Sequence, residues 1–385
     1  MTQEQRLIRD TVQTFVNKEL IPRERLMIRR EIAGGSGITQ PEDARELQAL
    51  AREAGLWGID CPEEHGGLNL DPISQAIVFE ELGKSFIKFL LPGSVPNVLY
   101  LVNDEQKKEY LLPTLRGERQ SCFALSEPGV GSDARNLRTT AVKNGGDWVI
   151  NGEKTWITWG MDADFALVFA RTRDEAGVDG VTAFLVDRSC GWTATPVRNM
   201  GHGDTSSLYF DNVRVSDRNR VGEINKGFSL AMRFVYRNRG WMLGARNVGA
   251  AQRLLGMALD HAENRTTFGK KLADRENIQF MITESEVELR ASKLMVWHCA
   301  WQGANEIDYR YAACAAKLYT ARMVNNVVDR VMQIHGAMGF AKETGIERWY
   351  RDLRVQRIFE GSDEMQLTRM FSDLRESRMV PGQLH

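Results

Sequence analysis

The sequence predicts a mostly α protein with a central β domain, and three features of the residue pattern lead to this prediction. Apolar residues follow helical spacing through residues 1–120, and the same spacing returns after Gly227. Between them, residues 121–222 carry short alternating runs that are typical of strands. Proline is absent from residue 197 to residue 380, which favours long, unbroken helices. We therefore expect three units, at residues 1–120, 121–222 and 223–385.

The first region opens with an amphipathic pattern directly after Met1, so we expect no signal peptide before the fold. Small residues at 34–37 and prolines between Pro62 and Pro72 interrupt the helical spacing and predict breaks between helices. The apolar stripe of the first helix comprises Ile8, Val12, Phe15 and Val16.

The middle region contains a hairpin signal. Residues 144–146, Asn-Gly-Gly, lie between the strand-like runs 139–142 and 148–150, and Asn-Gly is a favoured pair in tight hairpin turns. We therefore expect these two runs to form a hairpin. Further strands are expected at 165–169, 181–186 and 208–210.

The last region is predicted to be helical to its end. One stripe of valines recurs at positions i, i+3, i+4 and i+7, as on a helix that faces a core. A chain of 385 residues is long enough for two or three units that share a sizeable core. The valine stripe comprises Val324, Val327, Val328 and Val331.

Composition excludes several classes of protein. The net charge is −1 and the isoelectric point is near 6.6, which argues against a surface that binds nucleic acid. No apolar run reaches the length that spans a membrane. The histidines lack metal-ligand spacing, including His202 and His385, so we expect no metal site. Five scattered cysteines suit a reducing compartment, which we take to be the bacterial cytoplasm or, as an alternative, the mitochondrial matrix after import.

Residues 357–366 place one carboxylate in an apolar setting. Glu360 follows Ile358 and Phe359, and burial among such residues raises the pKa of a carboxyl group and makes it a better base near neutral pH. Gly361 carries no side chain, so a ligand can approach the backbone closely. The same pattern also occurs at ordinary helix ends and turns. Glu360 is therefore a candidate general base.

A second segment, residues 123–133, is rich in small residues. Ser126, Gly129, Gly131 and Ser132 can present N–H groups and hydroxyls to a polar or phosphorylated ligand. The segment matches neither Gly-x-Gly-x-x-Gly nor the P-loop pattern. It is either a ligand-binding loop or an ordinary Gly/Pro turn.

Taken together, the two segments make the chain resemble the acyl-CoA dehydrogenase family, whose members carry FAD. The resemblance covers nearly the whole chain, through six motifs in the family's order. These motifs are Pro-Glu-Glu-His-Gly-Gly at 62–67, the run 123–133, Asn-Gly-Glu-Lys-Thr-Trp-Ile-Thr at 151–158, Asn-Arg-Thr-Thr-Phe-Gly at 264–269, Gln-Ile-His-Gly at 333–336 and Phe-Glu-Gly at 359–361.

The resemblance implies an N-terminal helical domain, a β-barrel-like middle domain and a C-terminal four-helix bundle, assembled as a homotetramer. It also implies non-covalent FAD, with the adenine half bound partly across a subunit boundary. The implied cofactor-binding residues are Phe123, Leu125, Ser126, Gly131, Ser132, Trp156, Ile157, Thr158, Arg265, Thr267, Phe268, Gln333, Ile334, Gly336, Ser362 and Glu364. The implied substrate-binding residues are Ser132, Arg239, Phe359 and Gly361.

The implied chemistry is α,β-desaturation of an acyl-CoA thioester, as in fatty acid metabolism. Glu360 would remove the α-proton while the β-hydrogen leaves as hydride to flavin N5. Because a thioester α-proton is only weakly acidic, its carbonyl must be polarised, and the family does so with the backbone N–H of the base and a flavin hydroxyl. Electron-transfer flavoprotein would accept the electrons.

One stretch departs from the family pattern. Some relatives carry the base on a helix near 235–250, directly before an arginine. An ungapped count from Gly249 places that arginine on Gly240 and the alternative base on Arg239. A guanidinium stays protonated and cannot act as a base, which favours Glu360.

Arg237 and Arg239 suggest a hypothesis about the substrate. They are either surface or subunit-contact charges, or one of them points into the acyl pocket. In the second case it would favour a short or polar acyl group over a long saturated one.

Other functions remain open within the same resemblance. The chain could be an enoyl-CoA-type reductase, an oxidase or a desulfinase, because relatives share these motifs. A flavin-containing DNA-binding protein is the alternative from a different class, and the near-neutral charge argues against it.

Overall fold

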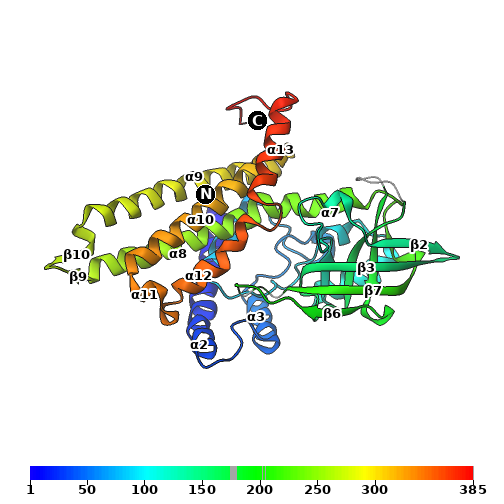
Figure 1. Cartoon of the computed structure of the whole chain (residues 1–385), viewed down its shortest axis with the longest axis horizontal. Helices are drawn as coiled ribbons and strands as arrows, with labels where there is room; N and C mark the ends of the chain where they lie inside the picture. The colour runs from blue at the N-terminus through cyan, green and yellow to red at the C-terminus, as the bar shows by residue number, and fades with distance from the viewer. Residues whose placement is uncertain (174–179, 202, 204, 385) are drawn as a thin grey trace.

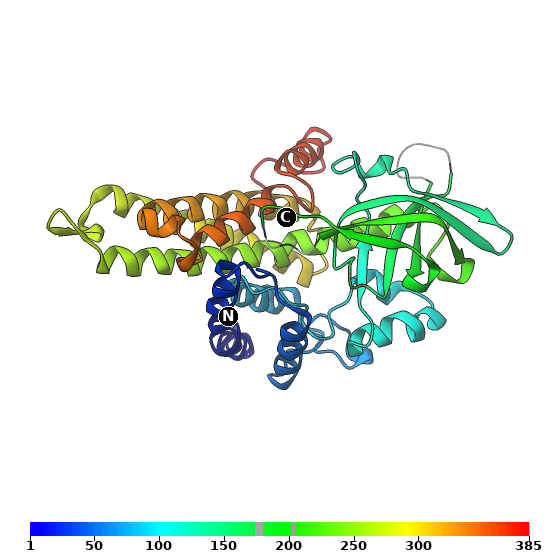
Figure 2. The same cartoon turned by 60° about the horizontal axis from the view of Figure 1, so that its bottom comes forward.

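A computed structural model describes residues 1–173, 180–201, 203 and 205–384 and has the predicted order of helix, strand and helix. A bundle of long helices occupies one end of the molecule and a β domain the other (Figure 1). The N-terminal helices lie along one side of both (Figure 2). The predicted fold class is thereby confirmed, whereas the exact unit boundaries at 120 and 222 stay predictions.

The N-terminal helices fall into two groups that pack on different partners. Helices α1 to α4 share a core with the long helices of the C-terminal bundle. Residues 95–115 pack instead on the sheet, where Tyr110 and Leu111 are fully buried. The helices are α1 (Gln3–Phe15), α2 (Ile21–Ile32), α3 (Pro41–Glu53), α4 (Pro72–Gly83), α5 (Asp104–Gln106) and α6 (Leu112–Arg116), with π turns Val16–Leu20 and Lys107–Leu111.

Local sequence explains where these helices begin. Thr2 and Gln5 form a capping box at the start of α1, with bonds of 3.1 and 3.0 Å. Asp71 accepts the N–H of Ile73 at 2.9 Å and caps α4. Pro41 and Pro72 occupy the first helical positions, where a missing N–H does no harm.

The central strands form one sheet in the order β6-β7-β3-β2-β4-β5-β8, with β1 beside β4. The predicted hairpin is present, since Asn144 pairs with Asp147 across the turn. The two halves of the sheet meet at a single pair, Thr140 with Arg171, and their inner side chains share one core, so the domain is barrel-like. The strands are β1 (Ser121–Ala124), β2 (Thr140–Asn144), β3 (Asp147–Thr158), β4 (Phe165–Arg171), β5 (Val181–Asp187), β6 (Thr193–Pro196), β7 (Thr205–Ser216) and β8 (Arg220–Val221).

The C-terminal region is helical except for a small hairpin at its tip. The valine stripe predicted for residues 324–331 lies in the core of α10, with at most 1% of each side chain exposed. Its elements are α7 (Gly227–Arg237), α8 (Leu243–Asn264), the tip strands β9 (Thr266–Thr267) and β10 (Lys270–Lys271), α9 (Glu276–Ala304), α10 (Arg310–His335), α11 (Ala337–Phe340), α12 (Ile346–Leu353) and α13 (Asp363–Arg375).

One long helix connects the β domain to the bundle. Helix α7 packs on the sheet, continues through the π turn Asn238–Met242 without a break, and enters the bundle as α8 (Figure 1). Along the described residues, no helix combines the length and the apolar character that crossing a bilayer needs.

Candidate active site

Glu360 lies on a tight turn between the 3₁₀ turn Arg354–Arg357 and helix α13. Its φ angle of 54° is left-handed, which is uncommon for a residue other than glycine. Gly361 follows with φ of 87°, and the hydroxyl of Ser362 accepts the N–H of Met365 to cap α13. The turn therefore holds a strained conformation that surrounding contacts must maintain.

Three side chains from other elements hold this turn. The guanidinium of Arg239 donates to the carbonyl of Glu360, and Gln366 donates to the same carbonyl at 3.3 Å and to that of Gly361 at 2.8 Å. The ammonium group of Lys317 donates to the Gly361 carbonyl at 2.7 Å. A Cβ on Gly361 would lie 2.7 Å from both Arg239 and Gln366 and would displace these side chains, and the φ of 87° also favours glycine.

The carboxylate of Glu360 is turned into the protein, although its neighbours Ile358 and Phe359, expected to bury it, are themselves exposed. Its Oε2 atom is buried and has no hydrogen-bond partner among the described residues, while Oε1 accepts from Asn238 at 3.4 Å. Burial raises the pKa of Glu360, against the opposing effects of Arg239, Asn238 and Lys317. The backbone N–H of Glu360 also has no acceptor in the described part of the chain, so both groups are available to a ligand.

The small-residue loop 123–133 is fixed to the sheet by a buried ion pair. Lys154 donates to Glu127 at 2.7 Å and to the carbonyl of Leu125 at 3.2 Å, and none of its surface is exposed. Burial lowers the pKa of Lys154 to about 8. The carbonyl of Ser126 accepts the N–H of Thr155 at 2.9 Å. Sequence reasoning quoted Glu127 and Lys154 within motifs but assigned neither a role.

Beyond this anchor the loop is open. Gly131 and Ser132 are exposed, and a Cβ on Gly129 or Gly131 would meet no atom within 4 Å. Space remains against the loop for a ligand.

Strand β3 turns one aromatic side chain outward. Trp156 has φ of 61° where the pairing register of β3 with β7 shifts, and 59% of its surface is exposed. Thr158 is also exposed, whereas Ile157 and Leu125 lie in cores, so only their backbone atoms are placed to touch a ligand. An exposed indole held in a strained conformation suits stacking on a flat ring.

The helix formed by α7 and the π turn brings the loop and the base together. Phe123 stacks on Phe234 with ring centroids 4.6 Å apart, and Asn238 contacts Glu360. Phe234 and Asn238 are four residues apart on one helix, and so about 6 Å along its axis. Loop 123–133 and the Glu360 turn thus meet the same stretch of helix. Ser362 lies in this turn, and the exposed Glu364 follows it at the start of α13.

The other predicted cofactor residues lie elsewhere. Lys317, which contacts the Glu360 turn, and Gln333 are sixteen residues apart on α10, or about 24 Å. The ring of His335 stacks on His261 at 4.3 Å, which joins the end of α10 to the tip of the bundle. Six predicted residues therefore form a second group: the exposed Arg265, Phe268, Gln333 and Gly336, the half-buried Thr267 and the buried Ile334.

The two arginines of the substrate hypothesis have other partners. Arg237 donates to Asp60, and burial lowers its pKa to about 10. Arg239 donates to the carbonyl of Glu360. At Gly240, a Cβ would lie 2.9 Å from the sulfur of Cys299, so the helix has no room for a side chain there. An acyl-tail role for Arg237 or Arg239 stays a prediction.

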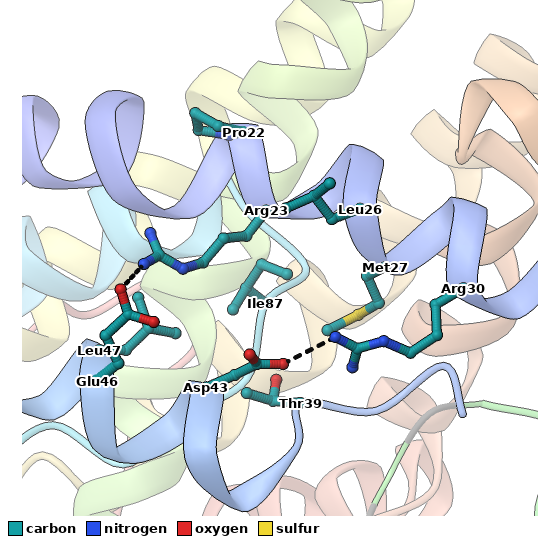
Figure 3. Close-up of a pocket in the computed structure, with 10 residues that line it drawn as sticks. All are labelled: Pro22, Arg23, Leu26, Met27, Arg30, Thr39, Asp43, Glu46, Leu47 and Ile87. Atoms are coloured by element: carbon teal, nitrogen blue, oxygen red, sulfur yellow. Dashed lines mark hydrogen bonds and ion pairs between the residues drawn. The ribbon is translucent and has the colours of Figure 1, made fainter. Parts of the chain in front are cut away.

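A hollow of about 290 Å³ between α2 and α3 is separate from this site. Two ion pairs rim it, Arg23 with Glu46 at 2.6 Å and Arg30 with Asp43 at 3.2 Å (Figure 3). Among the residues with a described structure, no group of three or more His, Cys, Asp or Glu side chains could hold a metal ion. His202 and His385 lie outside the described residues.

Comparison with known proteins decides the family. Family models match the chain as the acyl-CoA dehydrogenase N-terminal domain at residues 2–118, the middle domain at 122–213 and the C-terminal domain at 225–374. The chain belongs to the acyl-CoA dehydrogenase family. Members of this family are flavin-dependent oxidoreductases that act on CH–CH bonds of CoA thioesters, and the chain is such an enzyme.

Individual relatives cover nearly the whole chain. An (R)-benzylsuccinyl-CoA dehydrogenase from Thauera aromatica is 35% identical over 95% of this chain and 94% of its own. The caffeyl-CoA reductase-Etf complex subunit CarC from Acetobacterium woodii is 34% identical, covering 95% and 96%. The solved butyryl-CoA dehydrogenase from Megasphaera elsdenii superposes with a TM-score of 0.88 at 28% identity, covering 97% and 99%. The names of these relatives differ in the substrate and in whether the enzyme is called a dehydrogenase or a reductase.

Proposed function

We propose that this chain is an FAD-dependent dehydrogenase that desaturates an acyl-CoA between its α and β carbons, with Glu360 as the base. The observation that carries the proposal is the state of the Glu360 carboxylate. Its Oε2 atom is buried and has no partner among the described residues, and loss of solvation raises the pKa of the group. A carboxylate in this state gains by accepting a proton, as a general base must.

The same turn would also activate the substrate. The free N–H of Glu360 would donate to the thioester carbonyl, which stabilises the negative charge that develops as the α-proton leaves. Because Arg239, Gln366 and Lys317 hold the neighbouring carbonyls, this N–H keeps its direction through the reaction.

The residues present fit a flavin. The open backbone at Gly129 and Gly131 and the outward indole of Trp156 leave room for a planar ring beside Ser126. When bound, the flavin supplies the acceptor for the β-hydrogen and its electron pair. Arg265 carries a charge that suits a pyrophosphate, and Thr267, Phe268, Gln333 and Gly336 would complete the nucleotide side.

We propose a homotetramer, as the family resemblance implies, and the separation of the two groups of residues supports a site shared between subunits. The tip group lies about 24 Å along α10 from the residues that hold the catalytic turn. A single FAD would therefore use the catalytic side of one subunit and the tip of another. Electron-transfer flavoprotein is the proposed electron acceptor, supported by the name of the Acetobacterium relative. The five free thiols favour the cytoplasm.

Anaerobic titration tests the proposal. The purified protein is expected to be yellow, and its flavin band should bleach on addition of at least one member of a panel of acyl-CoA thioesters. If no thioester bleaches the band and an enoyl-CoA reoxidises the reduced protein, the enzyme is a reductase and the proposed direction of the reaction is wrong.

A further inference from the structure

Arg246, on helix α8, is a cation without a partner. Burial lowers the pKa of its guanidinium to about 10, so it stays charged at neutral pH. Its guanidinium lies over the ring of Phe79 at 5.0 Å, but no described residue forms an ion pair or a hydrogen bond with it. An unpaired buried charge is unfavourable, and an anion bound beside it would relieve that penalty.

The crossing of α4 and α8 fixes this position. The two helices approach so closely that a Cβ on Gly83 would collide with the backbone of Arg246, and one on Gly249 with the carbonyl of Glu80. This contact sets Phe79 against the guanidinium of Arg246. The same contact keeps the segment after Gly83, where α4 ends, near Arg246.

Lys88 lies on that segment and is a second cation near Arg246, paired with Asp352 at 3.7 Å. Burial lowers its pKa, the charge of Asp352 opposes this, and the charges of Arg348 and Arg246 add to it. Even so, 47% of the Lys88 side chain is accessible. The Lys88 side chain thus lies within reach of the charges of Arg246 and Arg348 and is still reached by solvent.

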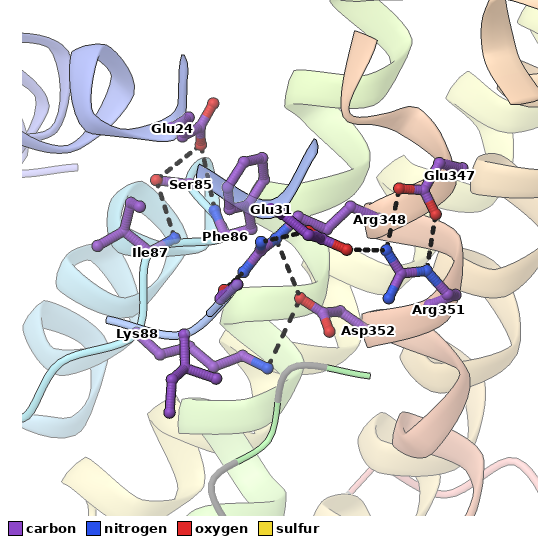
Figure 4. Close-up of polar contacts among 12 residues, drawn as sticks. Glu24, Glu31, Ser85, Phe86, Ile87, Lys88, Glu347, Arg348, Arg351 and Asp352 are labelled. Atoms are coloured by element: carbon purple, nitrogen blue, oxygen red, sulfur yellow. Dashed lines mark hydrogen bonds and ion pairs between the residues drawn. The ribbon is translucent and has the colours of Figure 1, made fainter. Parts of the chain in front are cut away.

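The cations Lys88, Arg246 and Arg348 lie close together, and the described acidic side chains near them pair with Lys88 and Arg348. Glu31 pairs with Arg348 at 3.3 Å. Asp352 is shared, with Lys88 at 3.7 Å and Arg348 at 3.8 Å (Figure 4). No acidic side chain among the described residues pairs with Arg246, whereas Lys88 and Arg348 each have one.

Helix geometry relates the cluster to the base. Asn238, which contacts Glu360, and Arg246 are eight residues apart, or about 12 Å along the axis. The π turn between them takes an additional residue per turn, which brings the two onto nearly the same face. Side chains on a helix lean toward its N-terminus, so Arg246 leans toward the base. The loop with Ser132 lies in the other direction, beyond Phe234, so an acyl tail that passes Glu360 into the bundle runs toward Arg246.

We propose that the substrate is a short acyl-CoA with a carboxylate at the far end of its acyl group, bound there by Arg246 with help from Lys88. This inference rests on the proposed dehydrogenase function. The carboxylate replaces the missing partner of Arg246 with a charge-assisted hydrogen bond, which a plain alkyl tail cannot do.

The test compares thioesters that differ only in their terminal group. We measure kcat/KM for adipyl- against hexanoyl-CoA and for glutaryl- against pentanoyl-CoA, in wild type, Arg246→Met and Lys88→Met. The exposed Arg25→Met on α2 is the control for loss of one positive charge. Binding of the same four thioesters to Glu360→Gln, with and without Arg246→Met, gives dissociation constants without turnover.

Wild type should prefer each dicarboxyl thioester at least about tenfold, and Arg246→Met should reduce that preference about ten- to a hundredfold, because a hydrogen bond to a charged group has this strength. Lys88→Met should reduce it less, and Arg25→Met should leave it unchanged. The inference alone fails if the plain thioesters bleach the flavin equally well, or if Arg246→Met weakens both members of a pair to the same extent. If none of the four bleaches the flavin, the proposed function fails and this inference falls with it.

Discussion

The turn that carries Glu360 and the hairpin at the tip of the bundle differ in how far the rest of the chain covers them. Arg239, Lys317 and Gln366 of the same chain hold the turn through its carbonyls. At the tip, 98% of Phe268 is exposed although its φ of 49° is also left-handed. The turn belongs to a motif that implied catalysis and the hairpin to one that implied FAD contact. Arg275 of the same chain donates to the carbonyl of Thr267 in the hairpin, but Phe268 stays exposed.

The proposed function gives the two segments different tasks, which are catalysis at the turn and cofactor binding at the hairpin. A base must keep its position relative to the substrate within a fraction of an ångström, so the chain that carries it also supports it. An exposed aromatic residue in a fixed conformation, by contrast, is suited to contact with a second molecule. Variants at the turn should therefore change chemistry, and variants at the tip should change cofactor retention.

The largest effect is expected at the base itself. Glu360→Gln should reduce the rate of flavin bleaching by acyl-CoA at least a thousandfold while FAD stays bound, because the amide is nearly isosteric and cannot accept the α-proton. Stopped-flow absorbance under anaerobic conditions measures the rate. Glu376→Gln, an exposed carboxylate at the end of α13, is the matched control and should react like wild type. Undiminished bleaching in Glu360→Gln would remove it as the base.

At the tip, Arg265→Ala should weaken FAD binding about ten- to a hundredfold, since a hydrogen bond between charged groups contributes about 1.5–3 kcal/mol. The flavin-to-protein ratio after dilution and gel filtration measures it. Lys270→Ala, an exposed cation on strand β10 of the same hairpin, should keep its flavin. Wild-type occupancy in Arg265→Ala would show that the dinucleotide binds elsewhere.

Lys317→Met should lower kcat about tenfold without loss of FAD, because the Gly361 carbonyl loses one of its two donors and the turn can relax. Arg322→Met is the control on the same helix, since Arg322 is exposed and pairs with Asp363 at 3.2 Å. If both variants lower kcat equally, the carbonyl contact has no special role.

The smallest effect is a shift in pH dependence. The charge of Arg239 lowers the pKa of Glu360, so Arg239→Met should raise that pKa. The base must be ionised to act, and the acidic limb of kcat/KM should therefore move to higher pH, by about one unit or less. Arg233→Met, an exposed arginine earlier on the same helix, should leave the profile in place. A shift to lower pH would contradict the assigned interaction.

Local patterns in the sequence were sufficient for much of the fold. The valine stripe of α10 and the turn after Asn144 depend on residues near one another in the chain, and both were predicted. Lys317 was not identified, because its partner Gly361 is 44 residues away and nothing next to a lysine in a helix reveals a distant carbonyl. The roles of Glu127 and Lys154 were missed for the same reason.

The count that placed an expected arginine on Gly240 had a different weakness. It assumed α-helical register from Gly249 back to residue 239. The π turn Asn238–Met242 lies across that interval, and a π turn holds one more residue than an α turn. When this chain is compared with a relative that lacks the π turn, an ungapped count from Gly249 is therefore wrong by one residue before the turn. In that case Arg239, and not Gly240, corresponds to the family's arginine.

The π turn is also a one-residue insertion preserved inside a helix. Deleting one residue there would restore regular α hydrogen bonding and leave the helix on either side in nearly its present orientation, because a π turn completes one revolution with one more residue than an α turn. Phe234 would stay against Phe123 and Arg237 near Asp60. The loss would fall on the turn itself, where the adjacent residues Asn238 and Arg239 both reach Glu360, so a chain shortened by one residue should fold and lose one of these two contacts.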